Sequence, residues 1–124
     1  MAPPVRFPIR FTGANRALAV LGVVPSQCRV ELDEAQLHVC FGWAFTMHAP
    51  LADVRGAAPD DGPVWAWGAH GWRGQWLVNG SSSGIVRIEF EPPAHAHTAG
   101  VPVTVRVLRV SLDDPDGLLA ALRR

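Results

Sequence analysis

This 124-residue sequence lacks two residue types, an excess of charge of either sign and a long apolar segment, and the last two absences restrict which partners the protein can have. There is no lysine and no tyrosine, and eleven arginines balance eleven acidic residues. No overall charge therefore attracts the chain to nucleic acid or to an anionic membrane. The longest apolar run, ALAVLGVV at 17–24, is far shorter than the roughly 20 residues that a membrane-spanning helix needs. A chain of this length is expected to form one domain around one core.

Cysteine is also scarce, because Cys28 and Cys40 are the only two. The strands expected around them place the two side chains on opposite faces, so we predict free thiols and a cytoplasmic protein. The alternative is export, since the apolar run follows several arginines as in a signal peptide. VPSQC, at 24–28, lacks the small residues of a lipoprotein site and no A-x-A cleavage site follows, so the pattern favours the cytoplasm.

Alternating apolar residues predict β-strands over the first half of the chain. VRFPIRF at 5–11 alternates and contains a proline, which favours an edge strand. From residue 28, the stretches CRVEL, QLHVCF and WAFTMH predict a three-stranded meander. One face of this meander is expected to be buried, and it consists of Val30, Leu32, Leu37, Val39, Phe41, Phe45 and Met47.

Two helices are expected, one near each end of the chain. TGANRALAVLG at 12–22 has a capping residue and a terminal glycine, which predicts a short helix, although a strand through LAVLGVV is the alternative. DDPDGLLAALRR is the clearer signal, with Asp114 at the cap and Pro115 at the first helical position. The apolar face of this second helix, Leu118, Leu119 and Leu122, must pack on the sheet.

The middle of the chain alternates between turn signals and strand signals. APLADVRG at 49–56 predicts a helical turn or an irregular crossover, AAPDDGP at 57–63 an exposed loop, and EPPAHAHTAG at 91–100 a polar excursion. VPVTVRVLRVSL changes its apolar phase, which indicates a bulge or a bend. The remaining strands are expected in VWAWG at 64–68, GQWLVN at 74–79, IVRIEF at 85–90 and this stretch, 101–112.

The order of these elements resembles a pleckstrin-homology-like (PH-like) barrel. VSLDDPDGLLAAL at 110–122 is similar to the strand-to-helix ending of bacterial PH-like domains, and FGWAFTMHAPLADV at 41–54 to their second and third strands with the crossover that follows. More narrowly, the chain resembles small PH-like proteins of high-GC bacteria whose function is uncharacterised.

This resemblance implies an α+β, mostly β fold: about seven antiparallel strands, a C-terminal capping helix and a short N-terminal helix. The whole chain, 1–124, would form one domain, with 1–27 as an extension and 28–124 as the barrel and helix. Phosphoinositide-binding relatives use basic residues between their first two strands. Here that loop contains Asp33 and Glu34, so no phosphoinositide binding is expected.

Two stretches contain the residue types of a catalytic or metal site, but they lack the neighbouring secondary structure or ligands that such a site requires. GSSSG at 80–84 matches G-x-S-x-G with Ser82 in the nucleophile position, but a strand rather than a helix follows, which predicts a turn. His95 and His97 would project to one side of a strand, yet a metal site needs a further ligand, so a solvated loop is predicted. We therefore expect no enzyme activity, no metal and no cofactor.

Four of the five tryptophans lie within twelve residues of one another, which is the strongest anomaly in the sequence. Trp65 and Trp67 alternate as one strand face, and Trp76 shares a face with Val78, so some of these rings are expected to fill the core. Trp72 is flanked by glycines, which favour a tight turn with exposed side chains.

HGWR at 70–73 is the best candidate for a contact surface, because exposed Trp and Arg are residue types that recur at interfaces. The function predicted is a non-enzymatic binding or adaptor module that recognises a protein, or a second copy of itself, through this loop or a sheet edge. The alternative is a small apolar or aromatic ligand in a tryptophan-lined pocket. The candidate binding residues are His70, Trp72 and Arg73, with Trp65, Trp67 and Trp76.

Overall fold

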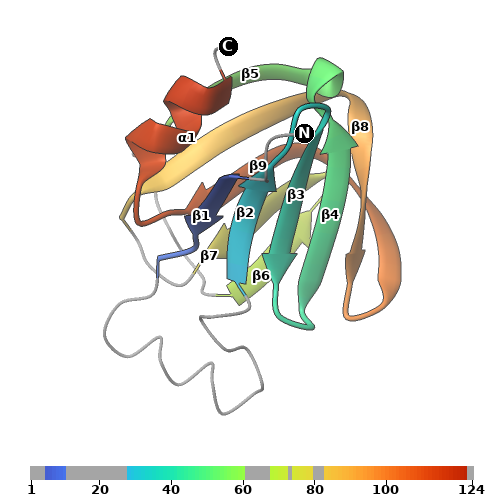
Figure 1. Cartoon of the computed structure of the whole chain (residues 1–124). Helices are drawn as coiled ribbons and strands as arrows, with labels where there is room; N and C mark the ends of the chain where they lie inside the picture. Colours follow the sequence, from blue (N-terminus) through green and yellow to red (C-terminus); the bar gives the residue numbers. More distant parts are fainter. Residues whose placement is uncertain (1–4, 11–27, 61–67, 73, 80–82, 123–124) are drawn as a thin grey trace.

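The computed structural model describes residues 5–10, 28–60, 68–72, 74–79 and 83–122. These residues form one curled sheet of nine strands with a single helix over one of its open ends, a half-barrel (Figure 1). The helix predicted over 12–22, together with Trp65, Trp67, Arg73 and Ser82, lies outside the described residues.

The first half of the sheet is an antiparallel meander. Its strands are β1 (Val5–Pro8), β2 (Cys28–Leu32), β3 (Gln36–Phe41) and β4 (Phe45–Pro50). Burial alternates along β2, β3 and β4, and the register places Val30 beside Val39 and Val39 beside Met47. The predicted buried face of this meander is confirmed, as is the edge position of the first strand.

The second half of the sheet contains one pair of parallel strands. A 3-10 turn (Leu51–Asp53) leads into β5 (Val54–Pro59), and β6 (Gly68–Trp72), β7 (Gln75–Asn79), β8 (Ile85–Thr98) and β9 (Val101–Ser111) follow. The strand order is β1-β2-β3-β4-β8-β9-β7-β6, with β5 paired to β8. Because β7 pairs in parallel with β9, the sheet is mixed, and the prediction of antiparallel strands throughout was wrong at this pair.

β8 is longer than predicted and accounts for two further corrections. The polar excursion predicted over 91–100 is strand as far as Thr98, because Ala94 and Ala96 are buried while His95 and His97 face solvent. The loop predicted over 57–63 begins as strand, since β5 pairs with β8 as far as Pro59.

The bulge predicted in the last strand is confirmed. The pairing of β8 with β9 shifts between Glu89 and Ala94. On the other side of β9, the N–H groups of Arg106 and Val107 both donate to the carbonyl of Gly74. Two residues of one strand that lie opposite a single residue of the neighbouring strand define a β-bulge. This bulge explains why the alternation of buried and exposed side chains in β9 changes phase along the strand.

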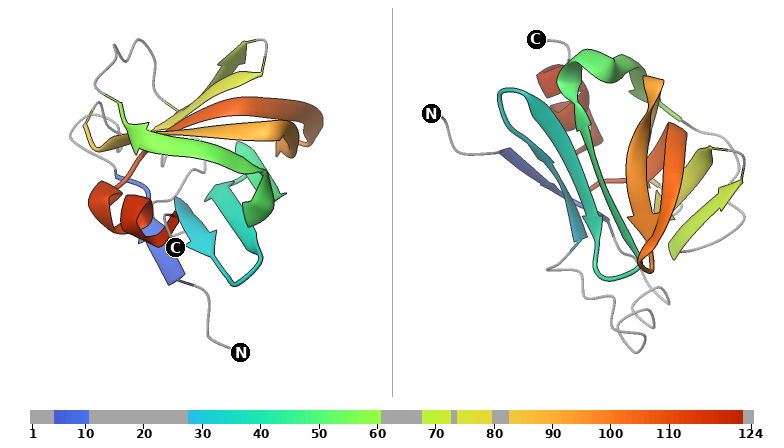
Figure 2. Two further views of the ribbon diagram at one scale, coloured as in Figure 1. Left: turned by 90° about the horizontal axis from the view of Figure 1, so that it is seen from above. Right: turned by 90° about the vertical axis from the view of Figure 1, so that its right-hand side faces the viewer.

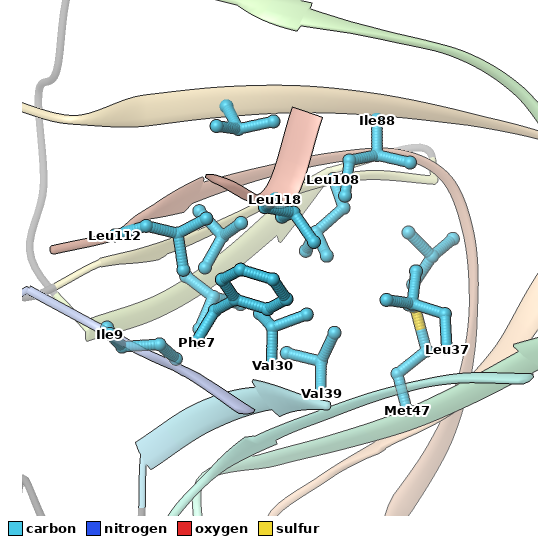
Figure 3. Packing of buried hydrophobic residues seen from close by; sticks show 14 of the residues in the cluster. Phe7, Ile9, Val30, Leu37, Val39, Met47, Ile88, Leu108, Leu112 and Leu118 are labelled. Atoms are coloured by element: carbon cyan, nitrogen blue, oxygen red, sulfur yellow. The ribbon is translucent and has the colours of Figure 1, made fainter. Parts of the chain in front are cut away.

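The helix α1 (Pro115–Leu122) covers an open end of the sheet beside β5 and β8 (Figure 2). Asp114 caps it, because its Oδ1 accepts the N–H of Gly117 at 3.0 Å. Leu118 and Leu119 are buried in the core, where Leu118 lies among residues of β1, β2 and β9 (Figure 3). The prediction of a capping helix with this apolar face is confirmed. No helix in the described ranges is long and apolar enough to cross a membrane.

Candidate functional site

The predicted contact segment lies in a β-hairpin made by β6 and β7. Trp72 pairs with Gln75 and His70 with Leu77, so only residues 73 and 74 connect the two strands. Gly74 has a left-handed φ of +81°, which glycine adopts without strain. Its carbonyl accepts the N–H of Arg106 at 2.7 Å, so the turn is fastened to β9.

β6 lies at the end of the sheet, and within the described residues it pairs with β7 alone (Figure 2). The polar backbone groups of successive strand residues point alternately to the two neighbouring strands. The Gly74 carbonyl points to β9, so the backbone N–H and C=O groups of Trp76 and Val78 also point to β9. Those of Leu77 point to β6. Opposite Trp76 and Val78 are Gly71 and Ala69, whose N–H and C=O groups therefore point away from the sheet.

Two other strands at a margin of the sheet, β1 and β5, contain proline and ion-paired arginine. The outer side of β1 is also bonded to the residues that follow β9, because the Pro8 carbonyl accepts the N–H of Asp113 at 3.1 Å. β1 contains Pro8, and its Arg6 forms an ion pair with Glu31 at 3.1 Å. β5 contains Pro59, and its Arg55 is paired with Glu91. Proline and charged side chains are the usual protection of a strand edge. β6, with the sequence GAHGW, contains no proline, arginine or acidic residue.

The structure separates the candidate binding residues that it describes. Trp76 is half-buried against the core, with its ring centroid 5.4 Å from that of Phe45 at an interplanar angle of 41°. His70 and Trp72 belong to β6, so part of the predicted contact loop is strand. Trp76 thus contributes to packing, and among the described residues β6 pairs with β7 alone.

Two surface grooves occur in the described part of the chain, and no tryptophan lines either of them. One has a volume of about 440 Å³ and lies beside the bulge, between Arg55, Phe90 and Arg106. The other has a volume of about 410 Å³ and lies on the outer face of the meander, where His38, His48 and Cys40 line it. Trp65, Trp67 and the side chain of Trp72 lie outside the described residues, so the prediction of a tryptophan-lined pocket stays a prediction.

The pairing of strands creates a row of histidines that sequence reasoning missed. His38 pairs with His48 across β3 and β4, and His48 pairs with His95 across β4 and β8. Residues that pair in this way point to the same face of a sheet. His95 and His97 share the exposed side of β8, as predicted for a strand, although they do not lie in a loop. No local signal reveals the row, because its members are far apart in sequence.

The chemistry of this row is limited. The ring centroids of His38 and His48 are 6.0 Å apart, and His38 Nε2 lies 3.7 Å from Asp33 Oδ2. Asp33 also closes the turn between β2 and β3, since its Oδ1 accepts the N–H groups of Ala35 and Gln36. Nowhere in the described ranges do three histidine, cysteine or acidic side chains form a group that could hold a metal ion.

Cys28 and Cys40 are not joined by a disulfide, and they lie on opposite faces of the meander as predicted. Burial raises the pKa of the Cys28 thiol from 9.0 to about 12, and the nearby Cys40 thiol adds to the rise. Cys40 is half-buried on the outer face, where its Sγ donates to the Gly42 carbonyl at 3.8 Å. Because the thiolate is the reactive form, Cys28 is not a nucleophile at neutral pH.

Comparison with known proteins adds no relative to this picture. No family model, curated protein or solved structure matches the chain.

Proposed function

We propose that this protein is a non-enzymatic recognition module that binds an extended protein segment as an additional strand beside β6. The observation that supports this most strongly is the strand pairing: Ala69 and Gly71 direct their backbone groups away from β7, and among the described residues β6 pairs with β7 alone. Addition of a strand to an exposed sheet edge is a common mode of peptide recognition, in which main-chain hydrogen bonds supply the affinity.

We further propose that the architecture is a variant of the PH-like barrel. The antiparallel meander, the curled sheet and the helix over its open end support this assignment, and the parallel pairing of β7 with β9 is where the chain departs from the pattern. The hydrogen bonds from Ala35 and Gln36 lower the pKa of Asp33. A carboxylate therefore stands where phosphoinositide-binding relatives place basic residues, which argues against a phosphorylated headgroup as the ligand.

Cys28 and Cys40 are thiols and not a disulfide, which favours a cytoplasmic location for this module. A catalytic role is not part of the proposal, because the described side chains include no arrangement of nucleophile, base and orienting group that we can assign. A small apolar ligand in a tryptophan-lined pocket is the weaker alternative, since Trp76 packs against Phe45.

A single pair of variants tests the proposal. Ala69→Pro removes one outward N–H of β6 without removing a hydrogen bond between β6 and β7. Ala69→Ser is the matched control, because it keeps this N–H. After thermal unfolding shows that both variants fold, crosslinked partners are compared in native lysate. We expect Ala69→Ser to retain the partners of the wild type and Ala69→Pro to lose them.

A further inference from the structure

The β3–β4 and β8–β9 hairpins end side by side at one end of the sheet (Figure 1). Their turns are joined through the carbonyl of Ala44, which accepts the N–H of Ala99 at 3.1 Å and the hydroxyl of Thr98 at 2.9 Å. The two turns therefore form one surface, which we call the hairpin end and define as residues 42–44 and 98–102.

The hairpin end contains exposed apolar side chains. Among the described residues, three large hydrophobic side chains are exposed, namely Val5 (53%), Trp43 (57%) and Val101 (59%). Trp43 and Val101 both belong to the hairpin end, one in each hairpin. Single exposed hydrophobic residues are ordinary on a protein surface, but two on adjoining turns indicate a contact surface.

The turn between β8 and β9 has an apolar residue at a position that favours a polar one. Thr98 pairs with Val101, so Ala99 and Gly100 form a two-residue turn, and both have a left-handed φ, +48° and +83°. Asparagine, aspartate or glycine is usual at the first of these positions, because a Cβ is strained there unless the side chain can bond locally. Ala99 is exposed, and it leaves this tip without the polar side chain that such turns usually have.

The lower parts of the two hairpins contain no negatively charged residue. The segments 39–47 and 94–105 have no aspartate, glutamate or arginine, and their ionisable side chains are Cys40, His95 and His97. Both histidines are exposed on the outer side of β8. Protonation of these imidazoles adds positive charge next to the hairpin end, and no carboxylate of the two segments offsets it.

The strands beside the hairpins begin with positive charge at this end. The first charged residue of β2 is Arg29, which is ion-paired with Glu31, and the first of β9 is Arg106. The carboxylates of Asp33 and Glu34 follow β2, at the opposite end of β3. An anionic surface that approaches the hairpin end therefore meets histidine and arginine before any carboxylate of the described residues.

We propose that the hairpin end inserts into the interfacial layer of a lipid bilayer that contains anionic lipid, with Trp43, Ala99 and Val101 below the level of the headgroups. Tryptophan is enriched at this depth, because its ring is apolar and its N–H is polar. His97 lies two residues before Ala99, about 7 Å from the tip, and is then level with the headgroup phosphates. So few inserted side chains give weak, reversible binding, with half of the protein bound at about 0.1–1 mM lipid.

Co-sedimentation with vesicles of mixed phosphatidylcholine and phosphatidylglycerol tests the insertion. Val101→Ser and Val5→Ser are matched variants, because the two valines are similarly exposed while Val5 pairs with Leu32 at the other end of the sheet. We expect the wild type and Val5→Ser to bind alike, and Trp43→Ser and Val101→Ser to bind about fivefold or more weakly. Vesicles of phosphatidylcholine alone are expected to bind less wild-type protein, and equal binding would overturn the preference for anionic lipid.

Tryptophan emission provides the second readout. Trp43→Phe keeps an apolar ring, so this variant is expected to retain most of the binding but to lose the blue shift that vesicles cause in the wild type. A blue shift that persists in Trp43→Phe would place another tryptophan in the bilayer and overturn the assignment to the hairpin end. A wild type that does not bind at about 1 mM lipid, or equal binding by Val5→Ser and Val101→Ser, would overturn the insertion itself. The partner comparison at Ala69 uses no lipid, so this proposal and the function proposed for β6 fail separately.

Discussion

The Cys28 thiol makes a quantitative prediction about stability in alkaline solution. Cys28 is 1% exposed, and burial raises its pKa from 9.0 to about 12. Between these values the thiol ionises in the unfolded chain but stays protonated in the folded protein. Ionisation therefore lowers the free energy of the unfolded state as the pH rises, and the free energy of unfolding falls by about 1.4 kcal/mol per pH unit.

The magnitude follows from the two pKa values. Stability from this group is complete below the unfolded pKa of 9.0 and is lost as the pH rises towards the folded pKa of about 12. Between about pH 8 and about pH 10.5 the expected loss is about 2 kcal/mol. The sequence isolates the effect, because it has no lysine or tyrosine to titrate in this range and arginine remains charged.

The assay is urea unfolding at a series of pH values with a reductant present. We expect the wild type and Cys40→Ser to lose stability in parallel, while Cys28→Ala, though less stable at neutral pH, shows a much flatter dependence between about pH 9 and about pH 10.5. If Cys28→Ala kept the full alkaline loss, the buried thiol would not be its source and the placement of Cys28 in the core would be refuted.

Three further variants test the cap of α1 and two glycine turns. Asp114→Ala removes the cap of α1 and is expected to lower the free energy of unfolding by about 1 kcal/mol, seen as an earlier urea midpoint; an unchanged midpoint would mean that the cap does not hold the helix. Gly84→Ala should destabilise more than Gly100→Ala. Both glycines have a left-handed φ, +70° and +83°, but only at Gly84 would the new Cβ clash with the Leu112 carbonyl oxygen. Equal losses of thermal stability would contradict that packing.

Local sequence patterns correctly predicted those parts of the fold that depend on residues close together in the chain. Alternation identified the buried face of β2, β3 and β4, because one side of each strand meets the core. Asp114 and Pro115 marked the start of α1, since a capping side chain acts within one turn of the helix. The phase change in β9 indicated its bulge for the same reason.

Features that depend on distant strands left no such pattern. The end of β5 consists of small residues that pair through the backbone with β8, so AAPDDGP looked like a loop. The glycines around Trp72 favoured a tight turn that includes Trp72, whereas β6 continues through Trp72 and the turn begins after it. The histidine row and the position of β6 at the end of the described strand order both follow from strand order, which the sequence does not encode locally.

The most direct test of the central claim is the comparison of crosslinked partners between Ala69→Pro and Ala69→Ser. The two variants differ in one outward N–H at the edge of β6, and both leave the β6–β7 pairing intact. If β6 receives a strand, Ala69→Ser captures the same protein as the wild type, whether another protein or a second copy, and Ala69→Pro does not. Equal capture by two folded variants would show that recognition does not use this edge.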